Sequence, residues 1–118
     1  MGLAPNLSLT TLFGASAVIE GTGPTTTVKF TLAELGVDGN IDSASPEELS
    51  AEGILLAILQ KAYTAQGSNS ARVFTADKLA PTITTRGVPG ELMTVRTERY
   101  TATFYSPEAG TYMDPDLI

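Results

Sequence analysis

Residues 45–67 constrain the fold more than any other part of this sequence, because they predict one long helix. Ser45 stands where a helix cap is expected, Pro46 follows at the first helical position, and Glu48 completes a capping box. Gly67 follows the last apolar residue of the segment and suits a left-handed helix end. We therefore predict a helix that runs from Ser45 to Gly67.

The predicted helix is apolar around most of its circumference. One stripe of apolar side chains recurs at helical spacing and further apolar residues widen it; these are Ala51, Ile54, Leu55, Ile58, Ala62, Leu49, Leu56, Leu59 and Tyr63. A surface helix normally exposes a broader polar face, so two interpretations stay open. Either a sheet curls around the helix within one subunit, or another copy or partner buries part of the stripe.

A β-hairpin is predicted before the helix. Residues 14–20 contain the β-branched Val18 and Ile19, residues 21–24 are a Gly- and Pro-containing turn, and residues 25–32 alternate between apolar and polar positions. This alternation is typical of a half-buried antiparallel strand. The side chains expected on its buried face are Val28, Phe30 and Leu32.

Three more strands are predicted after the helix, at residues 72–75, 83–86 and 91–105. In the last of them the apolar residues change face: Met93 and Val95 share one side, whereas Tyr100, Ala102 and Phe104 share the other. A regular strand cannot bury both sets on one side, so we predict a bulge or bend near Arg96–Arg99, or partial cover of both faces.

The order of these elements predicts an α+β fold. We expect a mostly antiparallel sheet of about five strands, in the order β-β-α-β-β-β, packed on one long helix. The 118 residues fit a single domain. Residues 1–12 are predicted to be an N-terminal arm or first edge strand, and residues 107–118 an irregular C-terminal tail.

Composition excludes several kinds of function. The chain has neither His nor Cys, which removes Ser–His and Cys–His nucleophiles and thiolate metal sites, so we predict no enzymatic activity and no cofactor. The net charge of −6 argues against nucleic-acid and membrane partners. No signal peptide or transmembrane segment is predicted, and the expected location is the cytoplasm or an assembled particle.

Charge is unevenly distributed along the chain. Residues 1–66 hold two basic residues against seven acids, a net of −5, whereas residues 72–99 hold five basic residues against three acids, a net of +2. Such asymmetry suits contacts between neighbouring subunits, but ordinary variation across a surface is the better explanation of it.

One stretch of the sequence is a weak candidate for binding a metal ion. Asp38, Asn40 and Asp42 place oxygen ligands at alternating positions, as in the first half of a calcium-binding EF-hand loop. The remaining ligand positions do not match, because Ser43 replaces the glycine and Leu49 replaces the bidentate glutamate. A plain turn needs the same residue types, so we predict that no metal ion binds here.

Two functions from different classes follow from these features. The first is a non-enzymatic structural or assembly subunit that associates with itself, in a virus-like or other large particle. Its interface candidates are Leu49, Leu56, Leu59, Tyr63, Tyr100 and Tyr112. The second is a small ligand-binding domain with a pocket between sheet and helix. Its candidate ligand contacts are Phe30, Ile58, Arg96, Tyr100 and Phe104.

Overall fold

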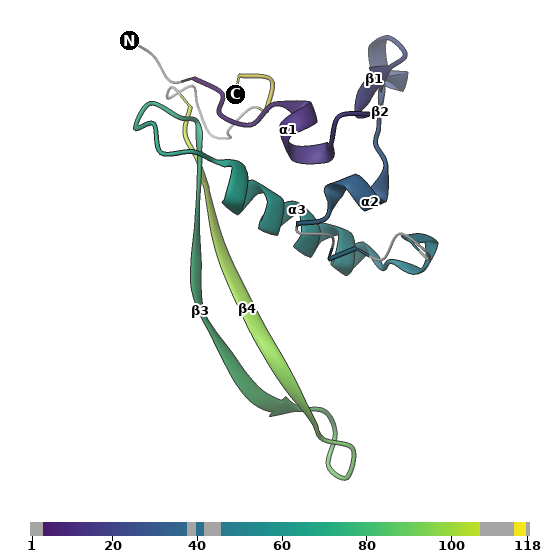
Figure 1. Ribbon diagram of the computed structural model, residues 1–118, viewed down its shortest axis with the longest axis vertical. Helices are drawn as coiled ribbons and strands as arrows, with labels where there is room; N and C mark the ends of the chain where they lie inside the picture. Colours follow the sequence, from purple (N-terminus) through teal and green to yellow (C-terminus); the bar gives the residue numbers. More distant parts are fainter. Residues whose placement is uncertain (1–3, 38–39, 42–45, 107–114, 118) are drawn as a thin grey trace.

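A computed structural model of the chain describes residues 4–37, 40–41, 46–106 and 115–117 (Figure 1). The helices are α1 (Leu9–Phe13), α2 (Leu32–Leu35) and α3 (Ala51–Ala65), and the strands are β1 (Val18–Glu20), β2 (Thr27–Lys29), β3 (Phe74–Arg86) and β4 (Met93–Phe104). Short 3-10 turns lie at Gly23–Thr25, Pro46–Glu48 and Pro115–Leu117. Most of the predicted tail at 107–118 lies outside the described residues.

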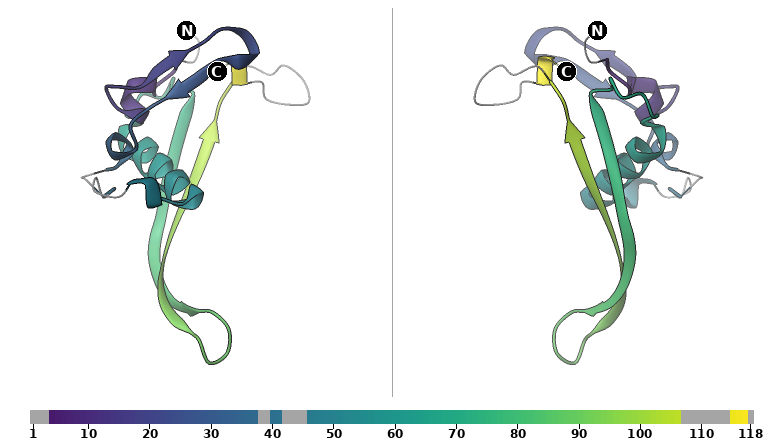
Figure 2. Two further views of the ribbon diagram at one scale, coloured as in Figure 1. Left: turned by 90° about the vertical axis from the view of Figure 1, so that its right-hand side faces the viewer. Right: turned by 90° about the vertical axis from the view of Figure 1, so that its left-hand side faces the viewer.

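The molecule is strongly elongated, with extents of 55 × 31 × 28 Å. Its radius of gyration is 17.3 Å, whereas a compact domain of this length has a radius of about 13.5 Å. The cause is the β3–β4 hairpin, which projects far beyond the helices in all three views (Figures 1 and 2). We call residues 77–101 the arm and the other described residues the base.

The core of the base consists of two small clusters. Leu35, Ile41 and Ala57 form the first, with Phe13, Phe30, Leu49, Ile54 and Ile58 packed against it. Ala62, Phe74 and Ala76 form the second, with Leu7 and Leu12 against it. Small helices and the start of β3 therefore cover one side of helix α3, on which Ala57 and Ala62 are buried, and no wide sheet among the described residues does so.

Helix α3 is shorter than the sequence predicts. It begins at Ala51, and the hydroxyl of Ser50 accepts a hydrogen bond from the Gly53 amide at 3.0 Å, so Ser50 is the N-cap. The prediction of a start at Ser45 was wrong, because Pro46–Glu48 form a separate 3-10 turn before this second cap. The predicted end is confirmed, since Gly67 adopts a left-handed φ of +71° just beyond the last turn.

The predicted first hairpin is confirmed in shortened form. Strands β1 and β2 pair antiparallel with Ile19 opposite Val28, around the Gly21–Pro24 turn. The predicted burial was wrong for Val28, since every residue of β2 is exposed. Phe30, just beyond β2, is partly buried against the first core cluster, in line with the prediction. Leu32 is not in the strand but begins helix α2, whose Leu35 is completely buried.

The α+β class is confirmed, but a single five-stranded sheet is not formed. The described strands make two separate antiparallel sheets of two strands each, β1–β2 and β3–β4. Residues 74–75 of the first predicted strand and the whole predicted strand at 83–86 belong to the continuous strand β3. The physical reason is the small base, where only the first residues of β3 are buried and the rest of the hairpin leaves the core.

An irregularity does lie where a bulge was predicted, but on the opposite strand. The register passes from Leu79 opposite Arg99 to Thr82 opposite Thr97, so two residues of β3 face Glu98 alone. Pro81 is one of those two residues, and a bulge tolerates proline because it needs no ladder hydrogen bond there. Strand β4 itself continues without an extra residue, so its side chains alternate regularly along the arm.

Candidate interaction surface

The arm exposes apolar side chains over its whole length and has no core of its own. Every β3 residue from Asp77 to Arg86 is exposed, and so is the loop that follows it. Ile83 is 70% exposed, Leu92 is 60% exposed and Met93 is 64% exposed. No layer among the described residues covers the arm beyond its junction with the base. Isolated hairpins of two strands are only marginally stable in water.

A polar cluster lies where the arm joins the base. The Tyr100 hydroxyl donates to the Glu98 carboxylate at 3.0 Å, Arg96 lies 3.3 Å from the same group, and Lys78 lies 3.8 Å from it. The hydrogen bonds from Tyr100 and Arg96 lower the pKa of Glu98, and burial raises the pKa of Tyr100. The Tyr63 ring on α3 packs edge-on against Tyr100 with centroids 6.0 Å apart, which ties the arm to the helix.

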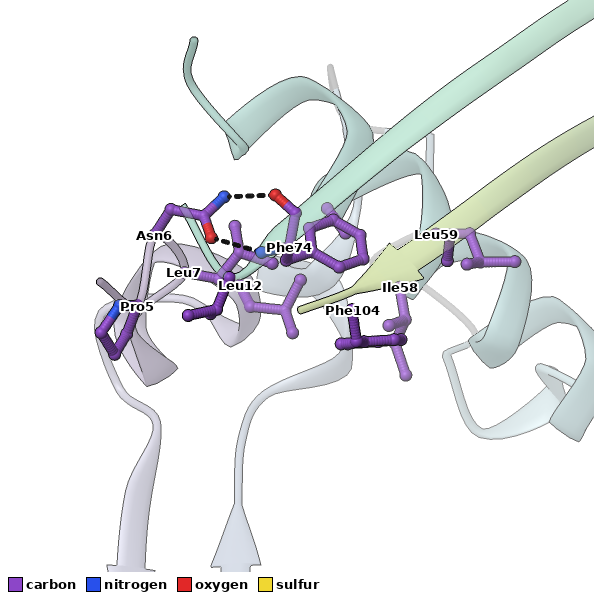
Figure 3. Close-up of a pocket in the computed structure, with 11 residues that line it drawn as sticks. Pro5, Asn6, Leu7, Leu12, Ile58, Leu59, Phe74 and Phe104 are labelled. Atoms are coloured by element: carbon purple, nitrogen blue, oxygen red, sulfur yellow. Dashed lines mark hydrogen bonds between the residues drawn. The ribbon is translucent and has the colours of Figure 1, made fainter. Parts of the chain in front are cut away.

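An apolar groove of about 380 Å³ opens in the base beside the arm (Figure 3). Its walls come from the N-terminal segment, from α3 and from the ends of β3 and β4; they include Leu7, Leu12, Ile58, Leu59, Phe74 and Phe104. Phe104 remains half exposed although its ring lies 5.2 Å from that of Phe74. The groove therefore presents aromatic and aliphatic surface with few polar groups.

The outer edge of β3 is closed by groups from the base. Ala4 forms a parallel bridge beside Arg72, and its carbonyl accepts from the Val73 amide at 3.1 Å. The Asn6 side chain accepts from the Phe74 amide and donates to the Phe74 carbonyl, both at 3.0 Å. The Gln66 side chain does the same for the next outward residue, Ala76, at 2.7 and 2.9 Å.

The outer edge of β4 is open over the part of the chain that the structure describes. Its ladder partner is β3, and among the described residues no backbone hydrogen bond reaches its other side. The strand runs for 12 residues without Gly, Pro or a bulge. Long regular edges of this kind template pairing with another strand.

The structure distributes the predicted interface residues over different surroundings. Leu49 packs into the first core cluster, Leu59 lines the groove, and Tyr63 and Tyr100 contact each other at the arm junction. Leu56 is 40% exposed on the outer side of α3. Tyr112 lies outside the described residues.

The predicted ligand contacts are only partly brought together. Ile58 and Phe104 line the same groove, whereas Phe30 packs on Phe13 in the first core cluster, with ring centroids 4.6 Å apart. Arg96 lies in the arm, and Tyr100 lines a separate polar pocket beside Glu98.

Of the three predicted metal ligands, the structure describes Asn40. Asp38 and Asp42 lie outside the described residues. The Asn40 side chain is engaged in other contacts, since it accepts from the Val37 amide at 2.9 Å and donates to Gln60 at 2.8 Å. Among the described residues no group of three or more carboxylates is gathered around a common point.

Sequence reasoning missed two parts of this surface. The apolar tip residues Val88 and Leu92 were treated as turn and strand, although apolar side chains beside Gly and Pro signal an exposed patch. The closure of the β3 edge by Asn6 left no local signal, because Asn6 and Phe74 are 68 residues apart in the sequence.

Comparisons with protein-family models, with curated proteins and with solved structures gave no match. Within the described ranges, no helix combines the length and the apolar character that crossing a bilayer requires.

Proposed function

We propose that this chain is a non-enzymatic assembly subunit that associates with copies of itself through its arm, as a building block of a virus-like or other large particle. The observation that carries the proposal is the projecting β3–β4 hairpin with exposed apolar residues and one open edge. A hairpin of this length has little to stabilise it alone, and a partner that covers it supplies the missing apolar contacts.

The accessible surface of the chain supports the same proposal. It measures 8560 Å², whereas a compact folded monomer of 12.3 kDa exposes about 6,100 Å². A standard protein interface buries about 800 Å² on each partner. The excess of about 2,500 Å² is thus large enough for more than one such contact, which suits a subunit with several neighbours.

Static light scattering on the purified chain across a range of concentrations tests the proposal. We expect a mass of at least two chains at micromolar concentration. A chain that stays at 12.3 kDa at all concentrations would refute self-association.

A matched pair of double variants shows whether the arm carries the contacts. Leu92→Ser/Met93→Ser removes apolar side chains at the arm tip, and Val18→Ser/Ile19→Ser removes two other exposed apolar side chains from β1. We expect the arm variant to lower the measured mass and the β1 variant to leave it unchanged. Equal behaviour of the two variants would show that the arm has no special role.

The groove favours a second candidate function, a domain that binds a small apolar ligand. Pockets for small ligands are typically apolar with a few polar groups, and the groove has the volume of a small pocket. Fluorescence titration with anilinonaphthalenesulfonate distinguishes the two functions. A ligand-binding domain takes up the dye as a monomer and loses it in Phe104→Ser, whereas an assembly subunit loses dye binding as its mass rises.

A further inference from the structure

The hydrogen bonds of β3 show which backbone groups of β4 point away from β3, toward the open edge. The amides of Phe74 and Ala76 face away from β4, toward Asn6 and Gln66, so the residues opposite them, Phe104 and Ala102, also point their backbone groups away from the ladder. Since β4 has no extra residue, the alternation continues along the arm. The outward backbone groups are therefore those of Thr94, Arg96, Glu98, Tyr100 and Ala102.

Resting on the assembly function proposed above, we infer that the open edge of β4 pairs antiparallel with β4 of a second copy, centred on Thr97. Two hairpins then form one continuous sheet of four strands about a two-fold axis. Strand β4 of each copy then lies inside the sheet. The two β3 strands form its outer edges, and in each copy Ala4, Asn6 and Gln66 already cover the beginning of β3.

Charge selects this register among the symmetric ones. A two-fold axis through the sheet pairs a residue with itself at the centre and joins only residues on the same face. A centre at Arg96 or Glu98 opposes two like charges. A centre at Thr97 places Arg96 opposite Glu98 of the second copy twice over, and opposite charges in directly facing positions stabilise a sheet.

The same pairing brings the arm tip of one copy to the groove of the other. The groove lies at the end of β4 that contains Ala102 and Phe104, and the exposed tip lies at the opposite end. Antiparallel pairing centred on Thr97 places Leu92 of the second copy opposite Ala102, on the face that lines the groove. The exposed tip and the half-exposed Phe104 thereby cover each other.

Single cysteines test the register cleanly, because the chain contains no native cysteine. The two Thr97 residues form a pair without ladder hydrogen bonds, with Cα atoms about 4.5 Å apart, which a disulfide can span. We expect Thr97→Cys to cross-link with itself under mild oxidation. Thr101→Cys is the matched control on the same face, and its two copies are separated by about 27 Å along the strands.

A mixture of Met93→Cys and Thr101→Cys provides an independent readout, since these positions face each other in the proposed register. We expect the mixed cross-link to form at least about tenfold faster than the Thr101→Cys self-link. If the chain self-associates but Thr97→Cys links no faster than Thr101→Cys, the strand pairing is wrong while the assembly function stands. If light scattering finds only monomer, both proposals are overturned.

Discussion

The base and the arm of this molecule bury their apolar residues to very different extents. In the base, Leu35 is fully enclosed and Ala57 and Ala62 are nearly so. In the arm, Ile83 and Met93 are mostly exposed although both occupy paired positions of the β3–β4 ladder. Regular secondary structure is thus not a sign of a finished core, and the arm has the properties of one half of an interface.

The edges of the hairpin repeat this contrast at the level of the backbone. The β3 edge is covered where it leaves the base by side-chain amides of Asn6 and Gln66 and further out is interrupted at Pro81. The β4 edge has neither protection within the described residues. Natural sheets usually blunt both edges, so a single unprotected edge indicates where pairing takes place.

The largest expected effect is the difference in stability between a substitution in the base and one in the arm. Leu35→Ala removes a fully buried side chain from the base and should lower the free energy of unfolding by about 2–5 kcal/mol. Ile83→Ala in the arm should cost less than about 0.5 kcal/mol in the dilute monomer. Chemical denaturation at low protein concentration measures both. Equal losses would mean that the arm has a core of its own.

Asn6→Ala tests how firmly the base holds the β3 edge. The substitution removes the side-chain amide that bonds the Phe74 backbone and the Gln66 carbonyl, leaving those partly buried groups without partners. We expect a loss of about 1–3 kcal/mol in the free energy of unfolding, again by denaturation. An unchanged stability would show that the closure of this edge is dispensable.

Charge reversal sharpens the distinction between contacts within the arm and contacts between arms. Arg96→Glu and Glu98→Arg each place like charges opposite one another in a β4–β4 pair, so each variant alone should associate about tenfold more weakly than the original chain. Mixed in equal amounts, the two variants should form a heterodimer, which sedimentation detects. Failure of the mixture to associate, or undiminished association of each variant alone, contradicts the proposed register.

The smallest expected effect is a pH dependence at the arm junction. The pKa of Glu98 is lowered in the folded chain by Tyr100 and Arg96, and Lys78 also attracts its charge. Its contribution to stability is therefore complete above the unfolded value of about 4.5 and is lost as pH falls through the lower folded value. The difference in melting temperature between the original chain and Glu98→Gln should shrink between about pH 7 and about pH 3. A constant difference would remove the ionised carboxylate from the explanation.

The parts of this fold that were predictable are those with local signals. The end of α3 follows from Gly67, and the first hairpin follows from its Gly- and Pro-containing turn. The start of α3 was misplaced because Ser45 and Ser50 both suit a helix cap, and Ser50 is the one that caps the helix. Periodicity and capping alone do not distinguish such alternatives.

The missing parts depend on contacts between distant residues. Two separate strands were predicted at 72–75 and 83–86 in place of one, because a bulge that accommodates Pro81 exists only once β4 is paired alongside. Helix α2 is too short at four residues to show a helical period, although it supplies the fully buried Leu35. The groove and the closed edge arise from segments that meet only in three dimensions.

Residue-resolved hydrogen exchange of β4 at two protein concentrations is the most direct test of whether β4 pairs with β4 of a second copy. At high concentration, the outward amides of Thr94, Arg96, Glu98 and Tyr100 should be protected, and dilution should restore rapid exchange at these alternate positions alone. Rapid exchange of the same amides at every concentration would contradict the pairing of β4 with another chain.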